Sequence, residues 1–364
     1  MIMDTHYKKL LILALGLFMG LSGSAQEKVS KKISKTYNMT NAGKLRIESK
    51  YGHINLNGWD RNEVAIEAII TVNHRKKENA EELLRRINPT FKDANDFVSI
   101  GYEIAEKSDN WFTNFFEKAN PFDYDRSNIQ IDYTIHLPIK AELNITNTFG
   151  DVILEDWAGK LRALVEHGDV WINQDINKAD VTMRYGKLRA KRIGYGTLDL
   201  RNGSLSMDAG TSIRINSSGT DMEMGPINSL ELYSNKDEIN LEQVGTIYGT
   251  LRFTTLELEH LETSVDLDMK IADFRVSEIL GDDTDIAIVQ ESSEVSLNIS
   301  GFSHEFEATL EQGLVRLPKS YENIDSKMLD KGKKLREISA SYGKTLQGKV
   351  SITGKKGVVL LKEL

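Results

Sequence analysis

Apolar and polar residues alternate in short runs along most of this chain, and the runs restart at a nearly constant interval. Four fragments mark the restart: Phe149–Val152, His167–Val170, Tyr185–Leu188 and Asn202–Leu205, each with glycine as its second residue. When that glycine is taken as an anchor, equivalent positions recur at intervals of 17 to 21 residues. The ten anchors are Gly150, Gly168, Gly186, Gly203, Thr220, Asp237, Thr254, Ala272, Ser293 and Gly313. An internal repeat of this kind determines the architecture of a chain.

The residues after each anchor indicate which side chains are buried. The second and fourth residues after all ten anchors are apolar, whereas the first and third are mostly polar or charged. Alternation with a period of two is typical of a β-strand with one buried face. A second alternating run, such as 161–165 or 198–200, precedes most anchors. Each repeat is therefore predicted to contain a strand, a tight turn at the anchor, a second strand and a loop.

Two strands in 17 to 21 residues leave no room for a crossover helix. We therefore predict an all-β fold in which residues 141–320 form a parallel β-solenoid, of the β-helix or β-roll kind, with two strands per coil. In such a fold each inward side chain stacks on its counterpart in the next coil. An antiparallel meander or a propeller is the alternative. Glycine at five of the ten anchors is expected because a tight turn often needs a positive φ angle.

The two ends differ from the repeats. Residues 26–140 are predicted to form a β-rich N-terminal cap with one further coil around Gly52 and a short helix over 78–87. Within 321–364, the stretch 323–339 is charged and is expected to be irregular, and closing strands follow it.

Residues 1–25 have the composition of a cleavable signal peptide. Lys8 and Lys9 precede an apolar run at 10–21, and the small residues Gly23 and Ala25 lie before the expected cleavage point. The run is too short to span a bilayer as a helix, and no other stretch approaches that length. The mature chain is therefore expected to be exported and soluble, with a periplasmic, cell-surface or secreted location. Because the sequence has no cysteine, lipidation at an N-terminal cysteine is excluded.

The composition excludes several kinds of partner and of functional site. A net charge of −8 argues against nucleic acid or an anionic membrane as the main partner. Zero cysteines exclude disulfides and thiolate chemistry, and the seven histidines show no zinc-binding spacing. Phosphate-binding and nucleophile motifs are also absent. We therefore predict no catalytic, cofactor-binding or metal-binding residues. The acidic stretch 281–285 is either a calcium loop or, more simply, a solvated turn.

Segments 51–54 (Tyr-Gly-His-Ile), 58–60 (Gly-Trp-Asp), 133–138 (Tyr-Thr-Ile-His-Leu-Pro) and 147–152 (Asn-Thr-Phe-Gly-Asp-Val) form a set, with the serial Gly-Asp-Val and Gly-Lys-Leu repeats after them. This set resembles the bacterial "putative adhesin" family, exported β-solenoid proteins of the domain of unknown function 4097 type. The resemblance implies a right-handed parallel stack in a cell-envelope setting, and it supplies no catalytic residues. The middle anchors, from Thr220 to Ser293, depart from the pattern because they lack glycine.

The stretch 110–124 is unusually aromatic. It contains six aromatic side chains, and we single out Trp111, Phe112, Phe115 and Phe116 as possible partner contacts. The alternative is a lid that covers the end of the repeat stack. Replacing Trp111 and Phe115 with serine would separate a stability effect from a binding effect.

The outward residues at the first and third positions after the anchors show no aromatic row on which a sugar chain would stack. We therefore expect a non-enzymatic cell-envelope scaffold or adhesion module, whose partner is an unknown envelope protein or glycan. A carbohydrate-active enzyme or a glycan-binding protein is the alternative, and the family setting also allows a sensor of envelope stress. An enzyme would gather three or more carboxylates or cations around one groove on adjacent coils.

Overall fold

The computed structural model describes residues 27–104 and 128–363, without the side chains of residues 102–104. The predicted signal peptide (1–25) and the aromatic stretch 110–124 lie outside the described residues. The chain divides into two compact units. The first unit takes its described residues from Met1–Lys32, Ile69–Asn88 and Glu103–Gln130, and the second from Ile33–Ala68, Pro89–Tyr102 and Ile131–Leu364.

Among the described residues before the repeats, the elements are strands and one helix. The helix α2 covers Lys77–Arg86, with Glu78 in its first turn and two arginines in its last, which suits the helix dipole. It ends one residue earlier than predicted, because the fully buried Ile87 is extended and begins the next strand. The strands are β1 (Glu27–Asn38), β2 (Lys44–Tyr51), β3 (Ile54–Trp59), β4 (Glu63–His74), β5 (Ile87–Ala94), β6 (Phe97–Ile104) and β7 (Ile129–Pro138).

The repeats lie in the second unit and consist of parallel strands. Leu161 pairs with Leu143 in the preceding repeat and with Ala179 in the following one, each 18 residues away. Neighbouring strands of a meander would instead be antiparallel. The strands are β8 (Glu142–Phe149), β9 (Val152–Glu155), β10 (Lys160–Glu166), β11 (Val170–Ile172), β12 (Ile176–Arg184), β13 (Lys187–Arg201), β14 (Ser204–Ser218), β15 (Asp221–Met224), β16 (Ile227–Asn235), β17 (Glu238–Arg252), β18 (Thr255–Lys270), β19 (Asp273–Ile279), β20 (Asp285–Glu291) and β21 (Glu294–Asn298).

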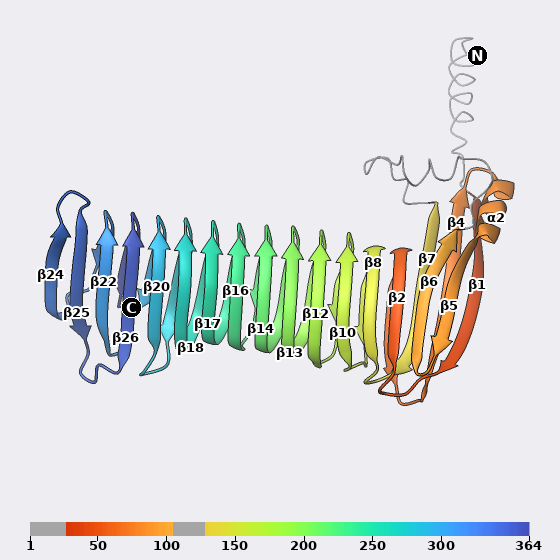
Figure 1. The fold of residues 1–364 in the computed structure, drawn as a ribbon, viewed down its shortest axis with the longest axis horizontal. Helices are drawn as coiled ribbons and strands as arrows, with labels where there is room; N and C mark the ends of the chain where they lie inside the picture. Colours follow the sequence, from red (N-terminus) through yellow and green to blue (C-terminus); the bar gives the residue numbers. More distant parts are fainter. Residues whose placement is uncertain (1–26, 105–127, 364) are drawn as a thin grey trace, which may run out of the picture. The chain divides into compact units, whose positions relative to one another are not determined.

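These strands form two faces around a shared core. The first face consists of the strand segments that run into the anchor turns, such as β10 and β12, which lie side by side in Figure 1. The second face consists of the segments that leave those turns, such as β9 and β11. Long strands serve both faces: β14 and β17 each pair with β15 on the second face and with β16 on the first, so these four parallel strands close on themselves.

The apolar residues predicted at the second and fourth positions after the anchors are buried, with two exceptions. Val315 and Leu317, in the last repeat, are only half-buried. The reason is that the final repeat does not stack as its position in the sequence suggests.

The end of the chain returns into the stack. Strand β26 (Gly348–Lys355) pairs in parallel with β20 on one side and with β22 (His304–Glu311) on the other. Figure 1 shows β26 between these two strands. In the same way β27 (Val358–Lys362) lies between β21 and β23 (Leu314–Arg316). The expected stacking of the Gly313 repeat directly on the Ser293 repeat is therefore wrong, since a chain segment more than thirty residues later separates them.

The charged stretch 323–339 is also more regular than expected. It forms most of an antiparallel hairpin of β24 (Glu322–Asp330) and β25 (Leu335–Tyr342), and β25 pairs with β22. Eight of the nine β24 residues are exposed, so this strand lacks the one-sided apolar pattern on which the prediction of strands depends.

At the other end of the second unit, β2 pairs in parallel with β8, and β3 pairs in parallel with β9. The residues around Gly52 therefore stack directly on the Gly150 repeat, although β4 to β7 intervene in the sequence.

Candidate functional site

The positive φ angle predicted for the anchor glycines occurs at Gly150 (132°) but not at Gly168 or Gly186. The residues with left-handed φ angles are those just before the anchors, such as His167 (54°) and Tyr185 (56°). The anchor glycines Gly168 and Gly186 are instead required by close packing. A Cβ atom at Gly168 would lie 2.0 Å from the carbonyl oxygen of Gly150, and one at Gly186 would lie 2.0 Å from that of Gly168. Each glycine thus admits the backbone of the preceding repeat.

The side chains just before these anchors form a ladder of stacked rings along the turn edge. Tyr51 and Phe149 stack with centroids 5.6 Å apart, Phe149 and His167 at 5.0 Å, and His167 and Tyr185 at 4.8 Å. All three pairs are within 11° of parallel. The ladder ends at Tyr185, because the equivalent residue of the next repeat is Asn202.

Three of the anchors that lack glycine, Thr220, Asp237 and Thr254, take part in a buried polar network. Asp237 is 5% exposed, and its carboxylate accepts hydrogen bonds from the hydroxyls of Ser217 and Ser234 at 2.6 and 2.5 Å. It also accepts from the backbone N–H groups of Thr220 and Asn235 at 2.8 and 3.1 Å. A buried carboxylate is tolerated only when its oxygens are satisfied in this way.

The network continues into the next repeat through Thr254. Its hydroxyl lies 2.8 Å from that of Ser234 and accepts from the backbone N–H of Asp237 at 3.3 Å. Ser217 and Ser234 occupy the place that Met183 fills in the Gly186 repeat, three residues before the anchor. A short residue there leaves space for an anchor side chain, which explains why glycine is dispensable at Thr220 and Asp237.

A groove of about 670 Å³ lies on the first face, directly above this network. Its floor is β14, and its walls are β13 and β16, because Asn216 pairs with Asp199 on one side and with Tyr233 on the other. Its lining side chains include Asp199, Arg201, Asn202, Asn216, Ser217, Ser218 and Tyr233. Ser217 donates to Asp237 beneath it, so the buried network fixes the floor of the groove.

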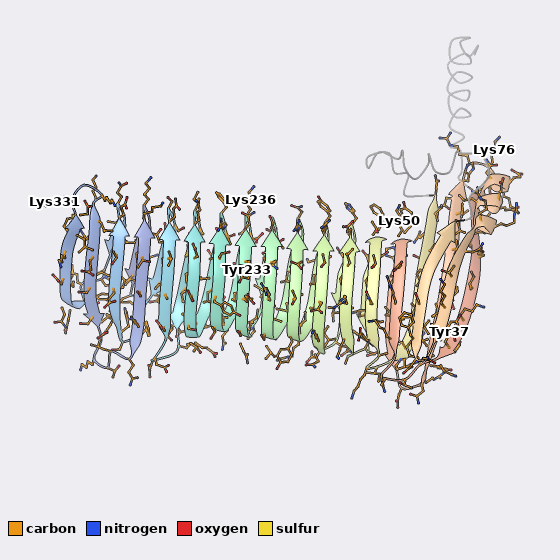
Figure 2. All side chains as sticks on the ribbon, in the orientation of Figure 1. Tyr37, Lys50, Lys76, Tyr233, Lys236 and Lys331 are labelled. Atoms are coloured by element: carbon orange, nitrogen blue, oxygen red, sulfur yellow. The ribbon has the colours of Figure 1, made fainter. Side chains whose placement is uncertain are left out.

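Tyr233 is held in place by two neighbours. Its hydroxyl donates a hydrogen bond to Glu231 at 2.8 Å, and the Arg214 guanidinium lies 5.4 Å from the ring centroid. Arg214 also lies 3.5 Å from Glu231. The hydrogen bond to Glu231, followed by partial burial and the carboxylate charge, raises the pKa of Tyr233 above its ordinary value. Figure 2 shows Tyr233 midway along the strands of this face.

The polar side chains opposite Tyr233 are free to bind a ligand. Within residues 27–104 and 128–363, the side chains of Asp199, Arg201 and Asn216 have no hydrogen bond or ion pair. Two further exposed tyrosines lie on the same face, Tyr195 (56% exposed) and Tyr248 (39% exposed). The register places Tyr248 beside Glu231 on the neighbouring strand.

Sequence reasoning missed this groove because only the residues after the anchors were searched for aromatic side chains. Those residues form the second face, whereas Tyr195, Tyr233 and Tyr248 precede their anchors and lie on the first. The signal was present in the sequence, in the alternating runs that end at 200, 234 and 251.

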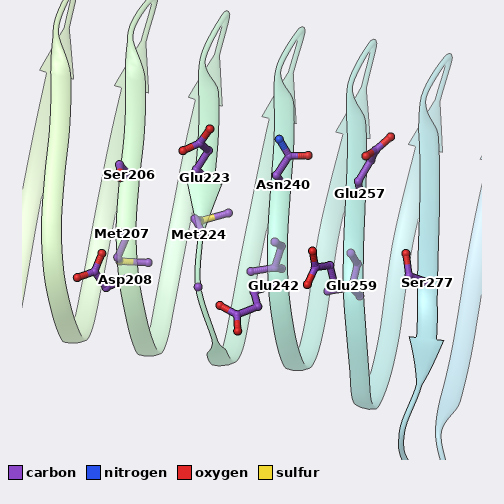
Figure 3. A pocket seen from close by; sticks show the side chains of 13 residues that line it. Ser206, Met207, Asp208, Glu223, Met224, Asn240, Glu242, Glu257, Glu259 and Ser277 are labelled. Carbon is purple, nitrogen blue, oxygen red and sulfur yellow. The ribbon is translucent and has the colours of Figure 1, made fainter.

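A second groove, of about 680 Å³, lies on the second face and is acidic. Figure 3 shows its carboxylates on adjacent strands. They are Asp208, Glu223, Glu242, Glu257 and Glu259. This groove meets the criterion of three or more carboxylates that was set for an enzyme. All five are exposed, however, and lack the burial by which a carboxyl group is usually made a general acid at neutral pH.

No group of three or more acidic or histidine side chains in the described part of the chain is arranged to hold a metal ion. Within the acidic stretch 281–285, the Thr284 hydroxyl donates to two backbone carbonyls. The described residues also contain no helix that is long and apolar enough to cross a membrane. Trp111, Phe112, Phe115 and Phe116 lie outside the described residues.

No protein-family model matches the sequence, and no curated protein is similar enough to count as a match. Solved structures do match. One, described as a "putative adhesin" from Parabacteroides merdae, has a TM-score of 0.30 and 12% identity over 93% of this chain and 97% of its own.

A second structure, a "putative adhesin" from Parabacteroides distasonis, has a TM-score of 0.27 and 14% identity over 73% of this chain and 92% of its own. A "putative lipid binding protein" from the same organism has a TM-score of 0.26 and 9% identity over 92% of this chain and 97% of its own. The adhesin description agrees with the family that the sequence resembles.

Proposed function

We propose that this chain is a non-enzymatic binding module of the bacterial cell envelope, in which the stacked repeats form a β-solenoid that presents a rigid face to an envelope partner. The parallel pairing at intervals of one repeat supports the solenoid interpretation. Strands that are paired on both sides hold their outward side chains in fixed positions, and such preorganisation lowers the entropic cost of binding.

The groove beside Tyr233 is the observation that carries this proposal. It combines a fixed aromatic ring with polar groups that have no partner within the described chain, Asp199, Arg201 and Asn216. Sites for ligands typically have this composition, an apolar or aromatic surface with a few placed polar groups.

Cosedimentation of the purified chain with envelope fragments tests the proposal. We expect saturable binding that falls at least tenfold for Tyr233→Ala combined with Asp199→Ala. The matched control is Tyr195→Ala, which removes an exposed tyrosine from the same face outside the groove and should bind like the parent. Absence of binding to any envelope fraction would show the proposal to be wrong.

The acidic groove on the second face favours a carbohydrate-active enzyme as the second candidate function. Glu223 and Glu257 lie two strands apart at the same register position. An enzyme of this kind would release reducing ends from a polysaccharide, and Glu223→Gln or Glu257→Gln would abolish the release. We expect no release from the parent chain, because neither carboxylate is withdrawn from water.

A further inference from the structure

The groove beside Tyr233 unites an aromatic surface, polar side chains that have no partner within the described residues, and a floor fixed by the buried network. The inference rests on the proposed function and specifies the ligand.

We propose that the groove binds a neutral glycan, with one pyranose ring packed against the exposed part of Tyr233 and its hydroxyls bonded by Asp199, Asn216 and Arg201. An aromatic ring offers a flat apolar surface, which suits the C–H face of a sugar ring. Planar carboxylate, amide and guanidinium groups provide the acceptors and donors that adjacent hydroxyls require.

The width of the groove suits a single sugar ring. Asp199, Asn216 and Tyr233 lie in one row on three consecutive strands, so the two walls are about 10 Å apart from backbone to backbone. After allowance for the side chains, this width admits a ring lying on its face against Tyr233. Asn216 and Ser218 form the floor; Asn216 is shorter than its neighbour Tyr233, and Ser218 is shorter than its neighbour Arg201.

The charge of the groove selects a neutral chain. Asp199 and Arg201, on the same wall, contribute one charge of each sign, and Arg214 is already paired with Glu231. A polyanion would meet the Asp199 carboxylate and gain only one unpaired cation, which disfavours an anionic polysaccharide. Binding should accordingly change little with salt concentration.

Because the Tyr233 ring is held in place, it binds a ligand at a lower entropic cost than a flexible side chain would. Glu231 and Arg214 restrain the ring, and the Asp237 network beneath holds the backbone of β14 and β16. A ligand that stacks on this ring therefore costs little side-chain entropy.

The test measures binding of the purified chain to soluble neutral polysaccharides (mannan, laminarin and dextran) and to anionic alginate by affinity electrophoresis. We expect retardation by at least one neutral polysaccharide, a loss of at least tenfold for Tyr233→Ala, and a loss of about fivefold for Asp199→Ala. Tyr233→Phe should bind within twofold of the parent, because the stacking surface is kept. Tyr195→Ala is the matched control and should also bind like the parent.

Three results would overturn the inference. They are retardation by none of the neutral polysaccharides, retention of full binding by Tyr233→Ala, and stronger binding to alginate that disappears with added salt. Circular dichroism and melting temperature of each variant separate a binding loss from unfolding. If the chain binds the protein fraction of the envelope but no glycan, the glycan inference fails while the proposed function stands.

Discussion

The repeats anchored by Gly168 and Gly186 and those anchored by Thr220 and Asp237 build the same turn in two ways. In the first set, glycine lets the backbone of adjacent repeats approach closely and the core is wholly apolar. In the second, anchor side chains fill the space and hydrogen-bond within a buried network. The stack tolerates both because parallel pairing sets the spacing, whereas the filling of the turn is local.

The floor of the candidate site belongs to the second kind of repeat. The groove lies over the repeats anchored by polar residues, where Ser217 links its floor to Asp237. A buried polar network specifies one arrangement of neighbouring strands more strictly than apolar packing does. We infer that this stricter specification is useful where outward side chains must hold a ligand.

The largest effect is expected from adding a side chain to a glycine anchor. Gly168→Ala would place Cβ 2.0 Å from the Gly150 carbonyl oxygen, a backbone atom that cannot move without disturbing two repeats. We expect a loss of about 3 kcal/mol in the free energy of unfolding. Because the φ angle of Gly168 is not positive, the loss is steric rather than conformational.

Urea unfolding followed by circular dichroism measures this effect. The control is Gly332→Ala, where the added Cβ meets only the Asp330 carboxylate at 3.3 Å and should change stability by less than about 0.5 kcal/mol. Equal losses in the two variants would show that close approach between repeats is not why glycine occurs at the anchors.

The second prediction concerns the polar anchors. Asp237→Ala removes the acceptor of four hydrogen bonds and leaves the buried backbone N–H of Thr220 and the part-buried N–H of Asn235 without this partner. We expect a loss of about 2 to 3 kcal/mol by urea unfolding. The control is Asp221→Ala. Asp221 is the exposed first residue of β15 on the second face, and its replacement should change the free energy of unfolding little. If Asp237→Ala had the same free energy of unfolding as the parent chain, the carboxylate would not be needed to stabilise the turn, and water would take its place.

Where a strand has alternating apolar and polar residues, the sequence predicted that strand correctly in most cases. The strands flanking the anchors follow from apolar residues with a period of two, and the burial of these residues agrees except at Val315 and Leu317 in the last repeat. The return of β26 between β20 and β22 was not predictable, because a strand with alternating residues fits any gap in a parallel stack equally well. The hairpin of β24 and β25 was missed because β24 buries no face.

The candidate site was less predictable than the fold. Alternation places Tyr195, Tyr233 and Tyr248 on an outward face, but only the register brings Asp199 and Asn216 into line with Tyr233. The role of Asp237 depends on hydrogen bonds between repeats that are 17 and 20 residues apart in sequence. A single sequence contains no sign of such pairings beyond the loss of glycine.

The third prediction concerns the C-terminal end of the stack, where the core beside β26 contains a histidine. His304 is fully buried, with Nδ1 2.7 Å from the Phe302 carbonyl oxygen and Nε2 2.7 Å from the Tyr321 hydroxyl. Burial lowers the pKa of His304, so the unfolded chain takes up a proton near pH ~6.5 while the folded chain does so only at lower pH. Between these values the unfolded state binds more protons, and stability therefore rises with pH.

We expect the free energy of unfolding to fall as the pH is lowered from 7 to 5, by at most about 1.4 kcal/mol per pH unit from this group. Melting temperatures at four pH values, for the parent and for His304→Gln, measure the difference. The variant should lose this part of the slope, whereas His260→Gln, on the outer surface of the second face, should keep it. An unchanged slope in His304→Gln would assign the pH dependence to other groups.

The smallest effect is expected at the turn edge, where the ring ladder ends at Asn202. Asn202 has a left-handed φ of 53°, as do His167 and Tyr185 in the ladder. Histidine and asparagine both tolerate this conformation, so Asn202→His should add a ring over Tyr185 without new strain. We expect a gain of about 0.5 kcal/mol, the lower end of the range for a stacked aromatic pair. The control is Ser292→His, which has the same backbone conformation between the non-aromatic Ile271 and Lys356. A gain in the first variant alone would show that the ladder stabilises neighbouring repeats; equal changes in both would show that the stacked rings merely follow the spacing of the strands.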